Sequence, residues 1–101
     1  MNILLACAMG MSTSLVVNKM KEAAEAQNKN YKIWATDIDS LEDEEDSFDI
    51  VMIGPQVAWR IDEVEDAVDG KAPIVIIDKD IYGKCDGAAV IAQAEKVLGK
   101  G

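Results

Sequence analysis

The stretch of residues 3–14, ILLACAMGMSTS, decides how the fold of this chain is interpreted. It begins with an apolar run that favours a buried strand, passes through Cys7, and ends in hydroxyl side chains that precede a segment with helical periodicity. Cys7 therefore stands where a strand passes into a helix. Three interpretations of Cys7 follow: a buried space-filling residue, a lipidation site, or a nucleophile directed at an anion.

Four apolar runs rich in β-branched residues predict four strands. They are residues 3–6 (ILLA), 31–36 (YKIWAT), 50–53 (IVMI) and 74–77 (IVII). Three of these runs are nearly continuous, a pattern typical of parallel strands that are buried on both faces. The second run alternates polar and apolar residues, which predicts an edge strand.

Helical periodicity separates these strands. The first helix is expected after Ser12, the second over residues 55–70, and the last from about residue 86. Residues 40–43 (SLED) resemble a capping box and predict a short helix. The residues expected to face the core are Val16, Met20, Ala23 and Ala24 in the first helix, Val57, Ile61, Val64 and Val68 in the second, and Val90, Ile91, Ala94, Val97 and Leu98 in the last.

This alternation predicts an α/β fold with right-handed crossovers: a single domain over residues 1–101 with a doubly wound, four-stranded parallel sheet in the order 2-1-3-4. Ligands of such sheets bind beyond the carboxyl ends of the strands, where the strand order reverses. That point lies between the first strand, which ends at Cys7, and the third, which ends before Gly54. Pro55 and Gln56 are therefore expected to form either a second wall of a site at Cys7 or simply the start of a helix.

Composition excludes several classes of function. A net charge of −9 makes nucleic acids and anionic membranes poor partners. Eight carboxylates lie between positions 37 and 49, and we interpret this stretch as a solvated face, with attraction of a basic partner as the alternative. No histidine is present, which excludes a Ser-His-Asp triad and a Cys-His pair, and two cysteines are too few for a zinc site. Neither a metal nor another cofactor is expected.

The residues before Cys7 disfavour lipidation. LLAC resembles a lipoprotein cleavage box, but only six residues precede the cysteine and none of them is basic. No apolar run approaches the ~20 residues of a membrane-spanning helix. We expect a cytoplasmic protein without membrane insertion, whose thiols stay reduced.

The residues after Cys7 support a nucleophile that faces an anion. A loop that enters a helix exposes backbone N–H groups without partners, and together with the helix dipole these groups bind anions. The same field is expected to favour the thiolate of Cys7, and Gly10 gives the loop its backbone freedom. The residues expected to bind phosphate are Ala8, Met9, Gly10, Met11, Ser12, Thr13 and Ser14.

The spacing from Cys7 to the helix start resembles the phosphate loop of low-molecular-weight tyrosine phosphatases, as does the predicted fold. That family has an arginine where this chain has Thr13, and an Asp-Pro pair that this chain lacks. The only arginine here is Arg60. Because a guanidinium group stabilises phosphoryl transfer to water, we expect a loop that holds a phosphoryl group without hydrolysing it. A phosphatase or arsenate-reductase-like enzyme and a non-enzymatic anion-binding module are the alternatives.

Three segments carry a resemblance to a known family. They are Cys7-x-x-Gly10-Met11-Ser12-Thr13-Ser14 with Leu15 and Asn18-Lys19-Met20, DIVMIGPQV at 49–57, and Tyr82-Gly83-Lys84 with Asp86-Gly87. On these residues the chain resembles the enzyme IIB proteins of the bacterial phosphoenolpyruvate-dependent sugar phosphotransferase system (PTS), in the lactose/cellobiose (chitobiose) class. The likeness covers essentially the whole chain. Ala8 and Met9 depart from the small residues, such as Ser and Ala, expected at their positions.

The resemblance implies a cytoplasmic phosphocarrier without a cofactor. Cys7 would accept a phosphoryl group from a phosphohistidine of enzyme IIA and pass it to a sugar, of β-glucoside or disaccharide type, held by the membrane-embedded enzyme IIC. The missing histidine fits this role, because the imidazole arrives with the donor. The protein would be a monomer associated with the inner face of the membrane through enzyme IIC.

Four further residues have candidate roles. Cys85 follows the fourth strand, about two inter-strand spacings of ~4.8 Å from the first, which is beyond disulfide reach of Cys7. We interpret it as a small apolar filler. Trp59, Arg60 and Met11 are candidates for a docking surface, with singly exposed side chains as the alternative.

Overall fold

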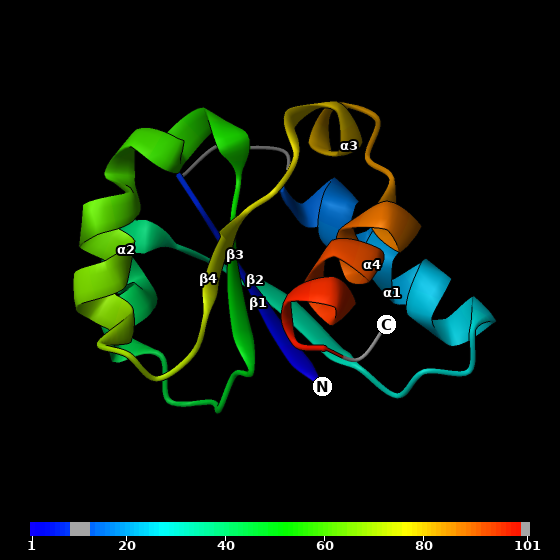
Figure 1. Cartoon of the computed structure of the whole chain (residues 1–101), viewed down its shortest axis with the longest axis horizontal. Coiled ribbons are helices and arrows are strands. Elements are labelled where there is room, and N and C mark those ends of the chain that lie inside the picture. The colour runs from blue at the N-terminus through cyan, green and yellow to red at the C-terminus, as the bar shows by residue number, and fades with distance from the viewer. Residues whose placement is uncertain (9–12, 100–101) are drawn as a thin grey trace.

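One sheet of four parallel strands organises the chain, which a computed structural model describes over residues 1–8 and 13–99. The strand order is β2-β1-β3-β4, which confirms the predicted order (Figure 1). The strands are β1 (Asn2–Cys7), β2 (Lys32–Asp37), β3 (Ile50–Ile53) and β4 (Ile74–Ile76). The register aligns Cys7 with Asp37 and Ala6 with Ile53, so the three neighbouring strands end at one edge.

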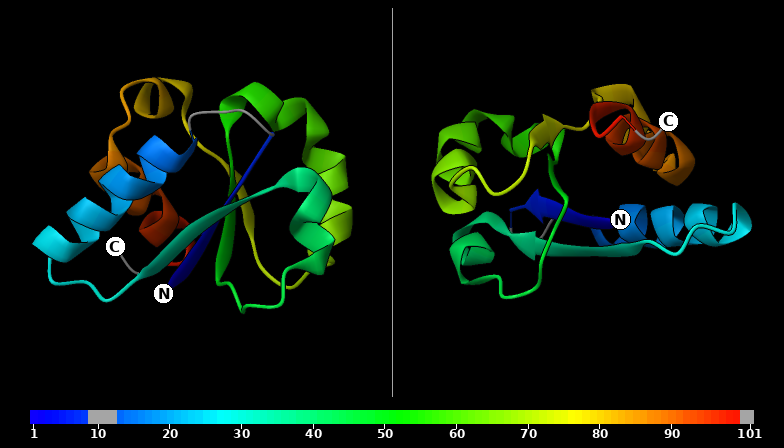
Figure 2. Two further views of the ribbon diagram at one scale, coloured as in Figure 1. Left: turned by 180° about the vertical axis from the view of Figure 1, so that it is seen from behind. Right: turned by 60° about the horizontal axis from the view of Figure 1, so that its bottom comes forward.

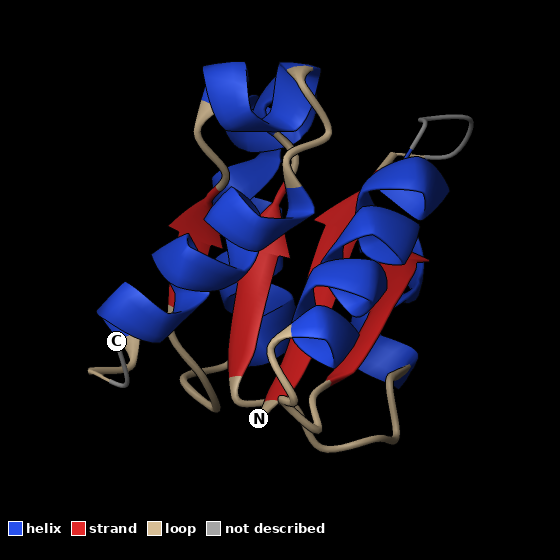
Figure 3. Cartoon of the chain, turned by 90° about the vertical axis from the view of Figure 1, so that its right-hand side faces the viewer, coloured by secondary structure: helices blue, strands red, loops and turns tan. Residues whose placement is uncertain are grey.

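Helices cover both faces of the sheet (Figure 2). On one face lie α1 (Thr13–Ala26) and α4 (Gly87–Val97), which Figure 3 shows in front of the strands. The 3₁₀-helices η1 (Ile38–Asp43) and η2 (Pro55–Arg60), together with α2 (Ile61–Val68), lie on the other face. The short helix α3 (Lys79–Gly83) follows β4 at the carboxyl edge.

Successive residues of β1 point into two separate cores, as the alternation of side chains along a strand requires. Ile3 and Leu5 pack in the core beneath α1 and α4, whereas Leu4 and Ala6 pack in the core beneath α2 and η1. All four side chains are buried. Both faces of β1 are therefore apolar, which explains why its run of apolar residues is continuous.

The predicted core faces are largely confirmed. Val16, Met20 and Ala24 in α1, and Val64 and Val68 in α2, are buried. The prediction is wrong at Val97, which is exposed, while its neighbour Glu95 is buried. The cause is a polar cluster: the Glu95 carboxylate accepts hydrogen bonds from Lys29 and Tyr31, both at 2.6 Å.

The expected second helix is divided in two. Its first turns form η2, which the non-helical backbone of Val57 (φ −118°, ψ 19°) interrupts, and a continuous α-helix begins only at Ile61. The C-terminal end involves Asp69, in a left-handed conformation at φ 52°, as well as the predicted Gly70 at φ 75°. Pro55 at the start of η2 and Gly70 after the end of α2 still mark the two ends of the predicted segment.

Two local predictions are wrong, and one helix was not predicted. The helix at residues 38–43 is capped by Asp37, whose side chain accepts from the Ser40 amide, so Ser40 is not the cap. The fourth strand is not buried on both faces: it is the second edge of the sheet, and Ile76 is 40% exposed. The unpredicted helix is α3, whose N-terminal amides are capped by Asp78.

Both chain ends lie at the edge of the sheet opposite Cys7 (Figure 1). Met1 precedes β1, and its carbonyl oxygen accepts from the amide of Lys32 at the start of β2. Gly99 follows α4, which returns from the carboxyl edge.

Candidate functional site

Cys7 is the last residue of β1 and is half-buried. Its thiol donates a hydrogen bond to the carbonyl oxygen of Thr36 in β2, with Sγ and O 3.6 Å apart. The sulfur is thus neither enclosed in a core nor free in solution. Only the protonated thiol can make this bond, because a thiolate has no proton to donate.

The end of β3 lies directly beside Cys7. The amide of Gly54 donates to the carbonyl oxygen of Ala6 at 3.2 Å, which joins the two strand ends. Pro55 is half-buried and Gln56 is exposed at the start of η2. Pro55 and Gln56 therefore start a helix at the same edge of the sheet as Cys7, and their role as a second wall of the site stays a prediction.

The predicted phosphate-binding residues are only partly within the described chain. Ala8 is half-buried and packs against the core beneath α2. Thr13 is buried and Ser14 is exposed at the start of α1, whose first turn contains no acidic residue. Met9, Gly10, Met11 and Ser12 lie outside the described residues.

A buried contact connects the start of α1 to α3. The hydroxyl groups of Thr13 and Tyr82 lie 3.2 Å apart, and both residues are buried. Sequence reasoning noted Tyr82 only as part of a family motif. The available signal was a tyrosine located after the fourth strand, at the same edge of the sheet as Cys7.

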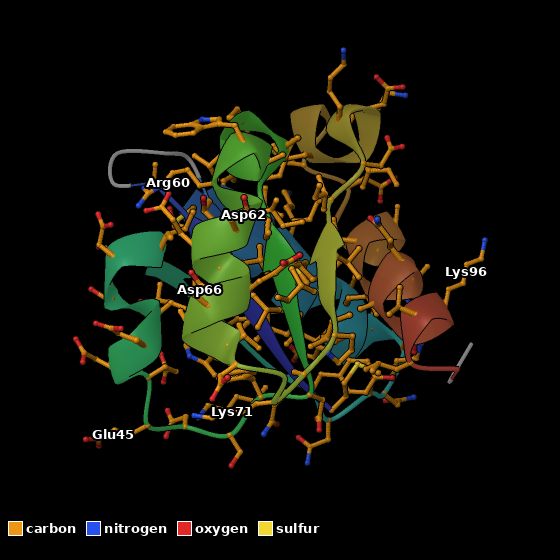
Figure 4. All side chains as sticks on the ribbon, turned by 60° about the vertical axis from the view of Figure 1, so that its left-hand side comes forward. Glu45, Arg60, Asp62, Asp66, Lys71 and Lys96 are labelled. Carbon is orange, nitrogen blue, oxygen red and sulfur yellow. The ribbon has the colours of Figure 1, made fainter. Side chains whose placement is uncertain are left out.

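Arg60 is bound by carboxylates. Its guanidinium group donates to Asp39 at 2.7 Å and to Glu63 at 2.7 and 3.1 Å. The hydrogen bonds to Glu63 and Asp39 raise the pKa of Arg60, and the hydrogen bond from Arg60 lowers the pKa of Glu63. The only arginine of the chain is therefore engaged between η1 and α2, as Figure 4 shows from the side of α2.

Among the described residues, one hollow lies at the carboxyl edge and another lies on the face of the sheet that α2 covers. One of about 360 Å³ is lined by Pro55, Gln56, Lys79 and Gly83, between the start of η2 and α3. The other, of about 310 Å³ between η1 and α2, is lined by four carboxylates and two apolar side chains: Asp39, Glu42, Glu63, Asp66, Ile38 and Ala67. The negative charge of the second hollow repels phosphate, so only the first is compatible with an anion.

Two kinds of feature are absent from the part of the chain that the structure describes. Among residues 1–8 and 13–99, no group of three or more His, Cys, Asp or Glu side chains could hold a metal ion. Within the same ranges, no helix is long and apolar enough to cross a membrane. Cys7 and Cys85 are both free thiols, and Cys85 is half-buried against the core beneath α1 and α4.

Several known proteins are similar to this chain. Residues 2–93 match the family described as "PTS system, Lactose/Cellobiose specific IIB subunit". The oligo-β-mannoside-specific EIIB component of Bacillus subtilis is 40% identical over 97 residues, covering 95% of this chain and 94% of the relative. The galactose-specific and cellobiose-specific EIIB components of Lactococcus lactis are also 40% identical, each over 102 residues with the same coverage.

Solved structures agree with this assignment. The solution structure of the cellobiose-specific phosphotransferase IIB component from Borrelia burgdorferi has a TM-score of 0.73 at 36% identity, covering 91% of this chain and 85% of that one. The lactose-specific IIB domain from Streptococcus pneumoniae has a TM-score of 0.81 at 15% identity, covering 95% of each chain, and supports the fold. The chain therefore belongs to the lactose/cellobiose-specific IIB family and is a phosphotransferase component of the sugar phosphotransferase system.

Proposed function

We propose that this chain is a phosphocarrier in which Cys7 accepts a phosphoryl group from a phosphohistidine of enzyme IIA and passes it to a sugar held by enzyme IIC. The observation that carries the proposal is the half-buried thiol of Cys7 at the carboxyl end of β1, beside the end of β3. In doubly wound sheets this position is where ligands bind.

Both transfers balance without a base or acid from this chain. In the first step the N–P bond of the phosphohistidine breaks, an S–P bond forms on Cys7, and the thiol proton passes to the imidazole. The hydrogen bond to Thr36 ends at this step, because the sulfur no longer carries a proton. In the second step the S–P bond breaks, an O–P bond forms with a sugar hydroxyl, and the proton of that hydroxyl returns to the sulfur.

The phosphoryl group is held by residues that follow Cys7. Backbone amides of Ala8, Met9, Gly10, Met11, Ser12, Thr13 and Ser14 would bind its oxygens. The hydroxyl groups of Ser12 and Ser14 would assist, while that of Thr13 contacts Tyr82. Because the first turn of α1 has no acidic residue, the dipole of this helix favours a dianion in front of it.

The engagement of Arg60 favours a carrier over a phosphatase. Hydrolysis of a phosphocysteine requires stabilisation of the charge on the transferring group, and arginine is the residue suited to it. Here Arg60 is paired with Asp39 and Glu63. The phosphoryl group on Cys7 is thereby expected to last until an acceptor binds.

Exposed apolar residues around the carboxyl edge are suited to partner docking. Leu15 in the first turn of α1, Trp59 in η2 and Ile76 at the end of β4 are large, exposed apolar side chains at this edge. Enzymes IIA and IIC would contact this edge in turn, since each must reach Cys7. The protein would act as a monomer in the cytoplasm, at the inner face of the membrane when bound to enzyme IIC.

The sugar is expected to be a β-glucoside or a disaccharide. The similar IIB components carry the names cellobiose, galactose and oligo-β-mannoside, of which cellobiose is a β-glucoside and a disaccharide, so the relatives differ in their sugar. Because the sugar is bound by enzyme IIC, its identity follows from the partner with which this chain transfers phosphate.

Intact-mass spectrometry tests the proposal. After incubation with phosphorylated enzyme IIA, the chain should gain one phosphate, and phosphorus NMR should identify it as a thiophosphate ester. Cys7→Ser should abolish transfer onward to sugar, while the matched Cys85→Ser variant should keep it. Turnover of p-nitrophenyl phosphate would instead indicate a phosphatase or arsenate-reductase-like enzyme. Binding of inorganic phosphate without any mass gain would indicate an anion-binding module.

A further inference from the structure

The contact between Thr13 and Tyr82 spans 69 residues of sequence and joins two helices at the carboxyl edge. Thr13 is only 3% exposed and Tyr82 only 6%, so water reaches neither hydroxyl well. A buried hydroxyl group that loses its partner is destabilising. The pair is thus a defined contact between the first residue of α1 and the helix that follows β4.

We propose that Tyr82 is a positioning residue for phosphoryl transfer: through Thr13 it holds the first turn of α1 in the orientation that receives the phosphoryl group on Cys7. This inference rests on the proposed function of Cys7. It adds a residue from α3, the helix that follows β4, to the machinery that serves the site.

Hydrogen bonds hold α3, the helix that carries Tyr82, in place. Asp78 caps α3 by accepting from the amides of Asp80 at 2.9 Å and Ile81 at 3.4 Å, and the amide of Tyr82 donates to the Asp78 carbonyl at 2.9 Å. The Gln93 side chain on α4 donates to the carbonyl of Ile76 at 2.9 Å and accepts from the amide of Asp78 at 3.3 Å. The position of α3 is therefore tied to both β4 and α4.

The helix that Tyr82 contacts is held from a second direction. At Gly87 the start of α4 approaches the backbone of Lys19 in α1 so closely that a side chain has no space. This crossing restrains α1 along its length, whereas the contact with Tyr82 restrains its first residue. The two together leave the N-terminal turn of α1 little freedom to rotate.

Orientation of this turn matters for the rate more than for binding of the donor protein. The amide dipoles act on charge that develops in the transition state, and their effect depends on their direction. A misplacement of about 1 Å can slow an enzyme roughly 10²-fold. Loss of one positioning hydrogen bond should therefore lower the rate constant for transfer, while the concentration of donor needed for half-saturation stays the same.

Single-turnover phosphorylation by enzyme IIA, followed by intact mass, tests this inference. With Tyr82→Phe the saturating rate constant should fall about tenfold and the half-saturating donor concentration should not change. Thr13→Val should lower the rate as well, and Thr13→Ser, which keeps the hydroxyl, should restore it. The double variant Thr13→Val/Tyr82→Phe should be no slower than Thr13→Val, since the two groups act as one unit.

Tyr31→Phe is the matched control, because it also removes a tyrosine hydroxyl, but one bonded to Glu95 in the cluster with Lys29, away from Cys7. Its rate constant should equal that of the wild type. An unchanged rate in folded Tyr82→Phe, or a change confined to half-saturation, would overturn the inference while leaving the proposed function standing. If Tyr82→Phe does not fold, equal rates for Thr13→Val and Thr13→Ser would overturn it. A wild-type chain that never gains phosphate on Cys7 would overturn both.

Discussion

The thiol of Cys7 donates its proton to the carbonyl oxygen of Thr36, across 3.6 Å between adjacent strand ends. This bond requires a protonated thiol, since neither a thiolate nor a phosphocysteine can make it. If Cys7 accepts a phosphoryl group as proposed, the bond to β2 is lost at that step.

Infrared spectroscopy should detect this bond. In a Cys85→Ala background, the S–H stretching band of Cys7 should lie at lower frequency than that of a free thiol in water, and it should vanish on phosphorylation. Cys7→Ala identifies the band by difference. A band at the free-thiol frequency would show that the bond to Thr36 does not form in solution.

Gly87 should tolerate no side chain. A Cβ atom there would overlap the carbonyl carbon and oxygen of Lys19, both backbone atoms. Gly87→Ala should therefore lower the free energy of unfolding by about 1–3 kcal/mol, measured by urea denaturation. Gly83→Ala is the matched control, because a Cβ there meets no atom within 4 Å. A loss of similar size in both variants would contradict the steric explanation.

The free energy of unfolding should decrease in acid, because the Glu95 carboxylate becomes protonated. Hydrogen bonds from Lys29 and Tyr31 lower the pKa of Glu95 from its ordinary value of 4.5. A lowered pKa means that the cluster contributes stability above pH 4.5 and loses it as the pH falls through the pKa of the folded protein. Between pH 7 and pH 3 the wild type should lose more unfolding free energy than Glu95→Gln, which cannot ionise. Equal losses in the two proteins would contradict this assignment.

The same cluster gives a prediction at neutral pH. Lys29→Met removes a donor from the largely buried Glu95 carboxylate and should cost about 1–3 kcal/mol of unfolding free energy. Lys96→Met is the control, since Lys96 is exposed on the same helix (Figure 4) and should change stability by less than about 0.5 kcal/mol. Urea denaturation at pH 7 measures both, and equal values would mean that Lys29 stabilises nothing.

Trp59 should matter for partner binding and not for folding. Its side chain is 79% exposed, so Trp59→Ala should leave the free energy of unfolding within about 0.5 kcal/mol of the wild type. If it docks against enzyme IIA, the half-saturating donor concentration should rise roughly tenfold or more, as expected for an interface tryptophan. Val97→Ala, an exposed apolar residue at the far end of α4, is the control and should have no effect. Equal half-saturation for Trp59→Ala and the wild type would exclude Trp59 from the docking surface.

Much of the fold was predictable because both faces of the inner strands are apolar. The runs ILLA and IVMI are continuous for this reason, and their order along the chain fixes the carboxyl edge where Cys7 lies. The wrong prediction at the end of α4 depended on distant partners. Glu95 is buried only because Lys29 and Tyr31, which lie more than 60 residues away in sequence, donate to it.

The location of the site at the carboxyl ends of the strands was predicted from the sequence, but helix α3 was not. A five-residue helix has no hydrophobic period to detect, and it is capped by Asp78 through two local hydrogen bonds. Without α3 the side chain of Tyr82 has no predictable direction. The likeness of the fold to low-molecular-weight phosphatases stays a prediction, and so do the phosphate-binding roles of residues 8–14.

The location of Met1 and Gly99 at the edge opposite Cys7 has a practical consequence. A fluorophore, an affinity handle or a fused carrier joined beside Met1 or Gly99 would lie away from the thiol of Cys7. Enzymes IIA and IIC could then be tethered to the chain, and the proposed transfers followed, without obstructing that thiol.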